Sequence, residues 1–265
     1  MLAVMRLLIW AMLLWTVPLA VAGAAPDKAL ESGTYIRTGD TGTLTLRRAR
    51  TGALEFELDT LGANAHECSA AGQVSGRIAT TLALSDERPN EVCRLDFQIQ
   101  GPHIRVRVLT SDNCSRHCGA RAAFEGDYSK PPANCTTTAV AQRRAQFLKQ
   151  YHAKQHALAA QSAEALLKDC SDFLFWFTQD SIRSDLALAQ LRAGQPKACL
   201  ATLEQTAAGK VADQEGLRAA LPPVEYDSYE WANAIWHNRR LCQQAISSSV
   251  VRQDQGRNGP GAARP

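Results

Sequence analysis

Apolar and polar residues alternate along several segments between residues 42 and 108, which is the period of a β-strand. Leu54, Phe56 and Leu58 alternate with acidic residues, so one face of this segment should be buried and the other exposed. Further alternating segments contain Leu44 and Leu46; Cys93, Leu95, Phe97 and Ile99; and Ile104, Val106 and Val108. Turn-forming residues at 39–42, 51–52 and 101–102 separate them. The pattern predicts a small antiparallel β-barrel or sandwich.

Beyond residue 133 the apolar residues recur at helical spacing instead. Lys130-Pro131-Pro132-Ala133 should separate the two parts, because two prolines stop a strand and do not continue a helix. Thr136 to Thr138 can cap the helix that follows. The helical positions are Val140, Phe147, Leu148 and Tyr151; Ala159, Ala163, Leu166 and Leu167; Ile182, Leu186, Ala189 and Leu191; Cys199, Leu200 and Leu203; and Tyr229, Trp231, Ile235, Trp236 and Leu241. The whole chain is therefore expected to be α+β.

The two ends of the chain differ in composition from the parts between them. Arg6, the apolar run Leu7–Leu14 and the small residues Ala20-Val21-Ala22 are typical of a cleaved signal peptide, and the run is short for stable membrane insertion. An Ala/Arg/Gln-rich composition favours a Gram-negative source and hence the periplasm. Ser, Gln, Gly, Arg and Pro dominate from Ser247 onward, which is typical of disorder. We expect a signal peptide (1–24), a disulfide-stapled β-domain (25–130), a helical domain (131–246) and a disordered tail (247–265).

All eight cysteines follow the expected cleavage site, and an even number in an exported chain favours disulfides. They are Cys68, Cys93, Cys114, Cys118, Cys135, Cys170, Cys199 and Cys242. A Cys68–Cys93 bridge would staple two strands, and Cys114 and Cys118 could pair across a tight turn. Two antiparallel helices would bring Cys135 to Cys170, and Cys199–Cys242 would tie the last helix to its neighbours. The sequence leaves the pairing open.

Charge and motif content argue against several classes of function. A formal net charge of +3 without a dense basic block does not predict nucleic-acid binding. The segments 66–68 and 114–118 contain metal-ligand residue types, but zinc requires reduced thiols, so we expect neither metal nor other cofactor. We find no nucleophile elbow, phosphate loop or paired carboxylates, so the chain is expected not to be an enzyme. An undetected hydrolase remains the alternative.

The segment Asp112–Gly119 closes the strand-like part and carries two cysteines. If disulfides present it as a rigid loop, the predicted binding residues are Asp112, Arg116 and His117, with Arg121 just beyond. They would contact another protein of the cell envelope. The alternative is that the segment is only the stapled end of a hairpin.

The run from Cys114 to Tyr128 reads Cys-x-x-x-Cys-Gly-x-x-Ala-x-Phe-x-Gly-x-Tyr. Together with the export signal, it resembles small exported proteobacterial proteins of the periplasmic lysozyme-inhibitor and immunity type. The resemblance implies that the partner is a cell-wall hydrolase. The Ser-Gly-x-x-Tyr loop of c-type lysozyme inhibitors is absent, and Gly126-Asp127-Tyr128 does not replace it.

The segments Asp185–Gln195 and Cys199–Leu203 resemble one helical hairpin of the tetratricopeptide type. That resemblance implies a stack of helix pairs that presents a groove to a partner. The helical half would then act as an envelope scaffold on a stable β-platform. A plain helical bundle is the alternative. The apolar segment Phe173–Phe177 is predicted either to lie buried between helices or to form a partner site.

Overall fold

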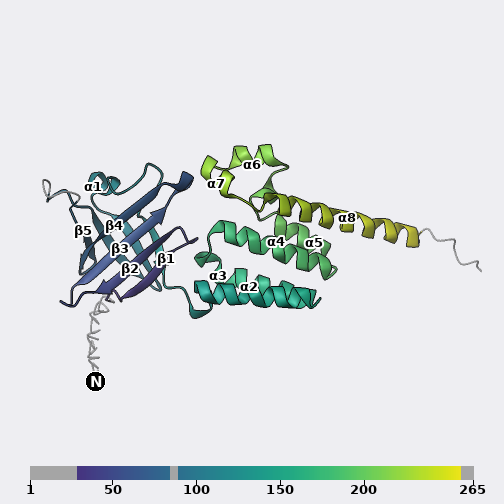
Figure 1. The fold of residues 1–265 in the computed structure, drawn as a ribbon, viewed down its shortest axis with the longest axis horizontal. Helices are drawn as coiled ribbons and strands as arrows, with labels where there is room; N and C mark the ends of the chain where they lie inside the picture. The colour runs from purple at the N-terminus through teal and green to yellow at the C-terminus, as the bar shows by residue number, and fades with distance from the viewer. Residues whose placement is uncertain (1–28, 84–88, 258–265) are drawn as a thin grey trace, which may run out of the picture.

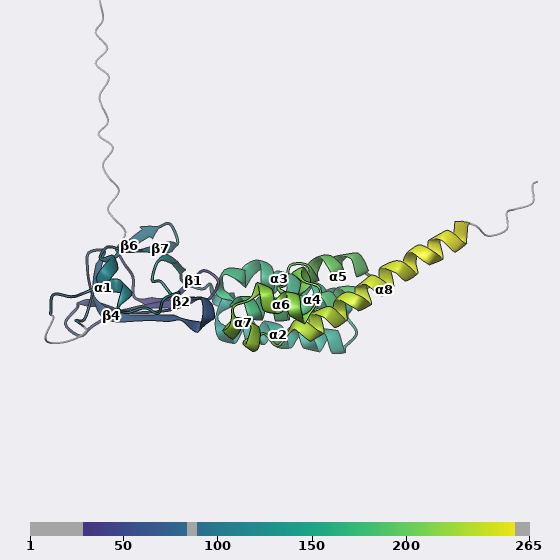
Figure 2. The ribbon, with the colours of Figure 1, turned by 90° about the horizontal axis from the view of Figure 1, so that it is seen from above.

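The computed structural model describes residues 29–83 and 89–257, which form a β-barrel followed by a helical half (Figure 1). Figure 2 shows the two halves side by side along the long axis, with the last helix extending away from the barrel. The predicted signal peptide lies outside the described residues. No helix within the described ranges is both long enough and apolar enough to cross a membrane.

Within the described residues the barrel has eight antiparallel strands, each paired with its neighbours in sequence. The strands are β1 (Gly33–Arg37), β2 (Gly42–Arg48), β3 (Leu54–Leu61), β4 (Glu67–Ser75), β5 (Ile78–Thr81), β6 (Arg94–Gln100), β7 (His103–Val108) and β8 (Gly126–Ser129). Pairing of Arg37 with Tyr128 joins β1 to β8 and closes the barrel. The α+β prediction is confirmed, and of its two alternatives for the β-part the structure is a barrel.

Alternation along the strands fills the interior of the barrel. Leu44 lies opposite Leu58, and Leu46 lies opposite Phe56. The Phe56 ring meets the Phe97 ring edge to face at a centroid distance of 5.5 Å. All five side chains are almost completely buried, and each contributes about 1.5–3 kcal/mol through burial.

Strand β4 passes through a Gly/Ala/Ser-rich segment that sequence patterning does not identify as a strand. Ala70 pairs with Leu58, and Gly72 pairs with Phe56, so small residues face large ones across the sheet. A Cβ atom on Gly72 would lie 2.0 Å from the carbonyl oxygen of Thr80. The small residues are therefore needed for β3, β4 and β5 to approach one another.

The helical half contains α2 (Thr137–His152), α3 (His156–Cys170), α4 (Trp176–Arg192), α5 (Pro196–Leu203), α6 (Gln214–Ala220), α7 (Pro223–Ser228) and α8 (Ala232–Arg257). A short helix, α1 (Ser111–Ser115), belongs to the barrel half, and 3₁₀ turns occur at η1 (Ala63–Ala65), η2 (Ala133–Cys135), η3 (Ser171–Phe173) and η4 (Ala208–Lys210). The Thr136 side chain caps α2 by accepting a hydrogen bond from the Ala139 N–H, as expected. Leu148 is 47% exposed, so it does not share the buried face of Val140 and Phe147.

The hairpins α2–α3 and α4–α5 are built alike. In the first, Ser162 donates to the side-chain oxygen of Gln150 at 2.8 Å, and in the second Thr202 donates to that of Gln190 at 2.8 Å. Each pair is separated by 12 residues. Both hairpins therefore use a buried glutamine to bind the second helix to the first.

The disulfides correct two of the suggested pairings. The structure joins Cys68 to Cys118 and Cys93 to Cys114, whereas Cys135–Cys170 and Cys199–Cys242 pair as expected. Cys114 lies in α1, and its sulfur atom is bonded to that of Cys93 in the segment just before β6. Cys118 lies beyond that helix beside β4, where the Ser69 N–H donates to the His117 carbonyl at 3.1 Å. Because the chain changes from helix to extended backbone between Cys114 and Cys118, their sulfur atoms lie beside different partners. Four disulfides joining all eight cysteines are typical of an oxidising compartment.

Helix α8 continues to Arg257, although Ser247 begins the stretch where disorder is expected. The Ser247 and Ser248 hydroxyls donate to the carbonyls of Gln243 and Gln244. Serine side chains in this helix therefore satisfy their hydrogen-bonding groups locally. The rest of the expected tail, residues 258–265, lies outside the described residues.

Replacing Cys68 and Cys118 together by serine should lower the free energy of unfolding by about 4 kcal/mol, because the bridge spans 50 residues. Replacing Cys93 and Cys114 should cost about 3 kcal/mol, since that bridge spans 21 residues. Urea denaturation of the oxidised proteins measures both values. Non-reducing peptide mapping of the wild type checks the pairing, and a recovered Cys68–Cys93 peptide would contradict it.

Candidate functional site

The two ends of the barrel have different surroundings. The turns at 38–41 and 62–66 belong to the end that contacts the helical half, here called the helix-side end (Figure 1). The turns at 49–53, 76–77 and 101–102 belong to the opposite end, here called the open end. Segment 109–125, which contains the predicted binding residues, belongs to the helix-side end.

Two disulfides hold the turn Asp112–Gly119 against separate parts of the barrel. Asp112, Arg116 and Arg121 are exposed. The Arg116 guanidinium lies 3.1 Å from a carboxylate oxygen of Glu91, so this arginine is held by an ion pair at the surface. The structure therefore places three of the four predicted residues where a partner can reach them.

His117 is placed differently. Its ring lies 6.4 Å from that of Phe124, measured between centroids. The Nε2 atom is buried and has no hydrogen-bond partner among the described residues. The backbone of His117 supports the turn through its carbonyl, and its half-buried side chain packs towards Phe124 with Nε2 shielded from solvent.

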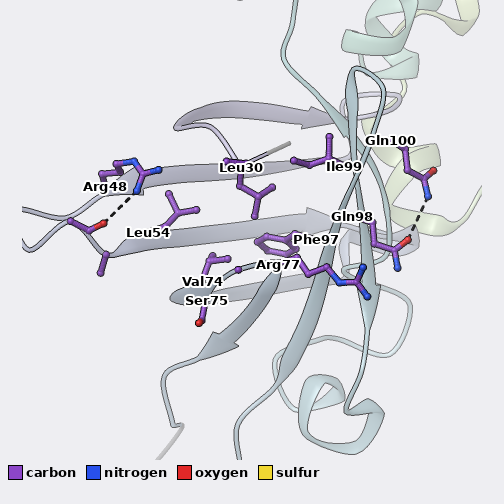
Figure 3. Close-up of a pocket in the computed structure, with 14 residues that line it drawn as sticks. Leu30, Arg48, Leu54, Val74, Ser75, Arg77, Phe97, Gln98, Ile99 and Gln100 are labelled. Carbon is purple, nitrogen blue, oxygen red and sulfur yellow. Dashed lines mark hydrogen bonds between the residues drawn. The ribbon is translucent and has the colours of Figure 1, made fainter. Parts of the chain in front are cut away.

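A cavity of about 1000 Å³ opens at the other end of the barrel (Figure 3). Its floor is apolar and consists of Leu30, Leu54, Val74, Phe97 and Ile99. Polar residues at its edge are Arg48, Ser75 and Arg77; Gln98 and Gln100 also line the cavity, but their side chains point to the opposite side of β6 from Phe97 and Ile99 (Figure 3). Residues from the N-terminal segment and from four strands contribute, so the cavity exists only once the barrel has closed.

The floor of the open-end cavity is held in place from below and from the side. Phe97 is only 1% exposed and fills the barrel beneath the cavity. The segment carrying Leu30 is fixed through Glu31, whose carbonyl accepts from the Tyr35 hydroxyl at 2.9 Å. The carboxylate of Glu31 accepts from Lys130 at 3.0 Å, and this hydrogen bond raises the pKa of Lys130. The cavity is therefore a cup closed at its floor rather than a channel into the barrel.

The rim of the cup is positively charged. Arg48 and Arg77 are the charged residues among the described residues that line it. The Nε of Arg77 lies 3.0 Å from Oδ1 of Asp96, and the other oxygen of Asp96 accepts from Gln98 at 2.7 Å. Arg48 donates to the Gly52 carbonyl at 3.4 Å. These contacts fix the arginines at the edge of an apolar surface.

This arrangement suits an apolar group attached to an anion. The floor can bury the apolar group, and the guanidinium groups can donate to a carboxylate or phosphate. Within the described ranges, no group of three His, Cys, Asp or Glu side chains is placed to hold a metal ion.

Sequence patterning identifies the floor but not the site. Leu54, Phe97 and Ile99 are recognised as buried strand positions from their alternation. Arg48 and Arg77 carry no motif: Arg48 ends β2, and Arg77 lies in the turn between β4 and β5. Only a weak signal exists in advance: both are basic residues at strand ends next to apolar ones.

Replacing Arg77 by methionine should lower the free energy of unfolding by about 1–2 kcal/mol, because the side chain of Asp96 is only 6% exposed and would lose its ion pair. Urea denaturation provides the measurement. Arg105→Met is the matched control: Arg105 also pairs with an aspartate, and its hydrogen bonds lower the pKa of Asp127. Since that aspartate is 36% exposed and the pair is screened by solvent, the control should lose clearly less stability than Arg77→Met. An equal loss in both variants would contradict the stabilising role given to Arg77.

Comparison of the chain with models of known protein families, with curated proteins and with solved structures found no match. What the protein does must therefore be inferred from the placement of its own residues.

Proposed function

We propose that this is a periplasmic binding protein, without catalytic activity, that recognises another protein through the open end of its barrel. The observation that carries the proposal is the apolar cup whose charged rim residues, among those described, are both arginines. The partner should present an apolar side chain beside a carboxylate.

The depth of the cup favours a protein partner over an enclosed small molecule. Pockets for small molecules usually bury most of the ligand surface. Here Phe97 and its neighbours fill the barrel below the floor, so a ligand cannot pass into the barrel and would be reached by solvent from the open end. A side chain protruding from a partner can enter the cup while its backbone stays outside.

The cysteines support a binding role rather than thiol chemistry. All eight lie in the described residues and all are bridged. A sulfur atom in a disulfide is not a thiolate nucleophile and does not ligate zinc. The cysteines therefore stabilise the fold as disulfides, and the export signal expected from the sequence agrees with that role.

A cell-wall hydrolase is the partner class suggested by the resemblance to periplasmic lysozyme inhibitors. The stapled turn offers a second contact surface for such a partner, because Asp112, Arg116 and Arg121 are exposed on it. Two disulfides reduce the entropy that the turn would lose on binding.

The helical half supports a second candidate function, that of an envelope scaffold. The two similar hairpins, α2–α3 and α4–α5, agree with a tetratricopeptide-like stack. In this alternative the helices recognise the partner and the barrel is a platform.

Inhibition of purified enzymes separates these possibilities. A muramidase and an amidase are assayed on peptidoglycan with increasing amounts of the mature protein, and a stoichiometric loss of turnover is expected for one of them. Arg48→Glu with Gln100→Glu makes the rim acidic and should weaken inhibition at least about tenfold, because it reverses the attraction for a carboxylate. Lys197→Glu on α5 adds negative charge away from the barrel and is the control.

The remaining variants locate the contact surface. Arg116→Glu with Arg121→Glu should weaken inhibition if the stapled turn also binds the enzyme. Unchanged inhibition by the rim variant, with a folded protein confirmed by its melting temperature, would overturn the role of the open end. Turnover of peptidoglycan by the protein alone would overturn the proposal that it is not an enzyme.

A further inference from the structure

A second cavity, of about 400 Å³, lies between the helix-side end of the barrel and the helical half. The barrel contributes Thr41, Leu61, Gly62, Ala63 and Ala65, and the helical half contributes Phe175, Trp176, Phe177, Val224, Glu225 and Ser228. The open-end cup is lined by the barrel half alone, whereas the walls of this junction cavity come from both halves of the chain.

The junction is held together by a reciprocal pair of hydrogen bonds. The side-chain oxygen of Asn64 accepts from the Val224 N–H at 3.2 Å, at the start of α7. In return, Oε1 of Glu225 accepts from the Asn64 N–H at 2.6 Å. This is the exchange of a capping box, but with the capping residue supplied by the barrel. It fixes the carboxylate of Glu225 in the wall of the cavity.

The second oxygen of Glu225 is the unusual feature of this wall. Oε2 is buried and has no hydrogen-bond partner among the described residues. A buried carboxylate oxygen without a donor is costly, since carboxylates normally accept several hydrogen bonds. Among the described lining residues, Glu225 is the charged one, so the cavity has a negative wall.

Aromatic rings form the other part of the wall. Phe175 and Phe177 meet edge to face with centroids 5.0 Å apart, and Trp176 stacks on Tyr229 at 5.3 Å. Tyr229 is in turn held by its hydroxyl, which donates to Asp180 at 2.7 Å. The rings are therefore braced rather than free to collapse into the cavity. Aromatic faces attract cations through their quadrupole, most strongly where water is excluded.

We propose that the junction cavity binds a small organic cation, an ammonium carried on an apolar or aromatic body. The apolar body lies against Leu61 and the aromatic rings, and the ammonium lies beside the negatively charged side chain of Glu225, whose shielded Oε2 has no donor of its own among the described residues. The site differs from the open-end cup in charge: that cup carries arginines and suits anions, whereas this cavity carries a carboxylate. Because both halves line it, the ligand also stabilises their present arrangement.

Three ligands of similar shape but different charge test whether the junction cavity prefers a cation. Phenethylammonium, 2-phenylethanol and 3-phenylpropanoate are titrated into the mature oxidised protein at neutral pH. The readout is the indole N–H resonance of Trp176, assigned with Trp176→Phe, because that residue lines the junction cavity and not the cup. Phenethylammonium should bind about tenfold more tightly than the alcohol, and the carboxylate should not shift the resonance.

Glu225→Gln tests the residue. The amide oxygen of glutamine can still accept from Asn64, so the junction should persist while the charge is lost. Affinity for phenethylammonium should fall about tenfold, to the level of the alcohol. Glu230→Gln, an exposed acid outside the cavity, is the matched control and should bind like the wild type.

Equal shifts from the three ligands would show an apolar cavity without charge preference and would overturn the proposal. Absence of any shift, or unchanged cation binding in Glu225→Gln, would overturn it as well. These results do not bear on the open-end cup, whose partner is tested by enzyme inhibition.

Discussion

The pairing of β8 with β1 is the contact on which the rest of the structure depends. It is short, joining Ile36 to Ser129 and Arg37 to Tyr128, but it turns a sheet into a closed barrel. Closure removes the unpaired sheet edges and leaves the ends as the places where the barrel meets other parts of the structure. It also brings β8, the last strand, beside the first, so the helical half begins close to the start of the barrel.

The two ends then take different roles. One is covered by the helical half, with Asn64 capping a helix that begins far along the chain. The other stays open, with Phe97 as its floor and Arg48 and Arg77 at its rim. The two cavities carry opposite charge because the barrel supplies the arginines of the cup, whereas the helical half supplies Glu225 of the junction cavity. If both proposals hold, the molecule can recognise an anionic and a cationic group at once.

Alternation explains why much of the barrel follows from the sequence. The strands around Leu44, Phe56, Phe97 and Val106 each have one buried face, so their apolar residues fall at every second position. Strand β4 is hidden because its inward residues are Cys68, Ala70 and Gly72, which accommodate larger neighbours. Small residues carry little hydrophobic signal, and their role appears only beside Leu58 and Phe56. The helical repeat is partly hidden for a similar reason, since its shared feature is a buried glutamine.

The sequence by itself determined the class of the fold and the change from strand-forming to helix-forming segments, because these depend on local periodicity. It suggested the crosslinks of the helical half without fixing them, and the structure decided the pairing. Only the tertiary structure decided that the sheet closes, that Cys68 joins Cys118, and that His117 turns inward while Arg116 stays exposed. It alone assembled the cup and the junction cavity, because their residues are distant in sequence and no local pattern encodes distances across a closed barrel.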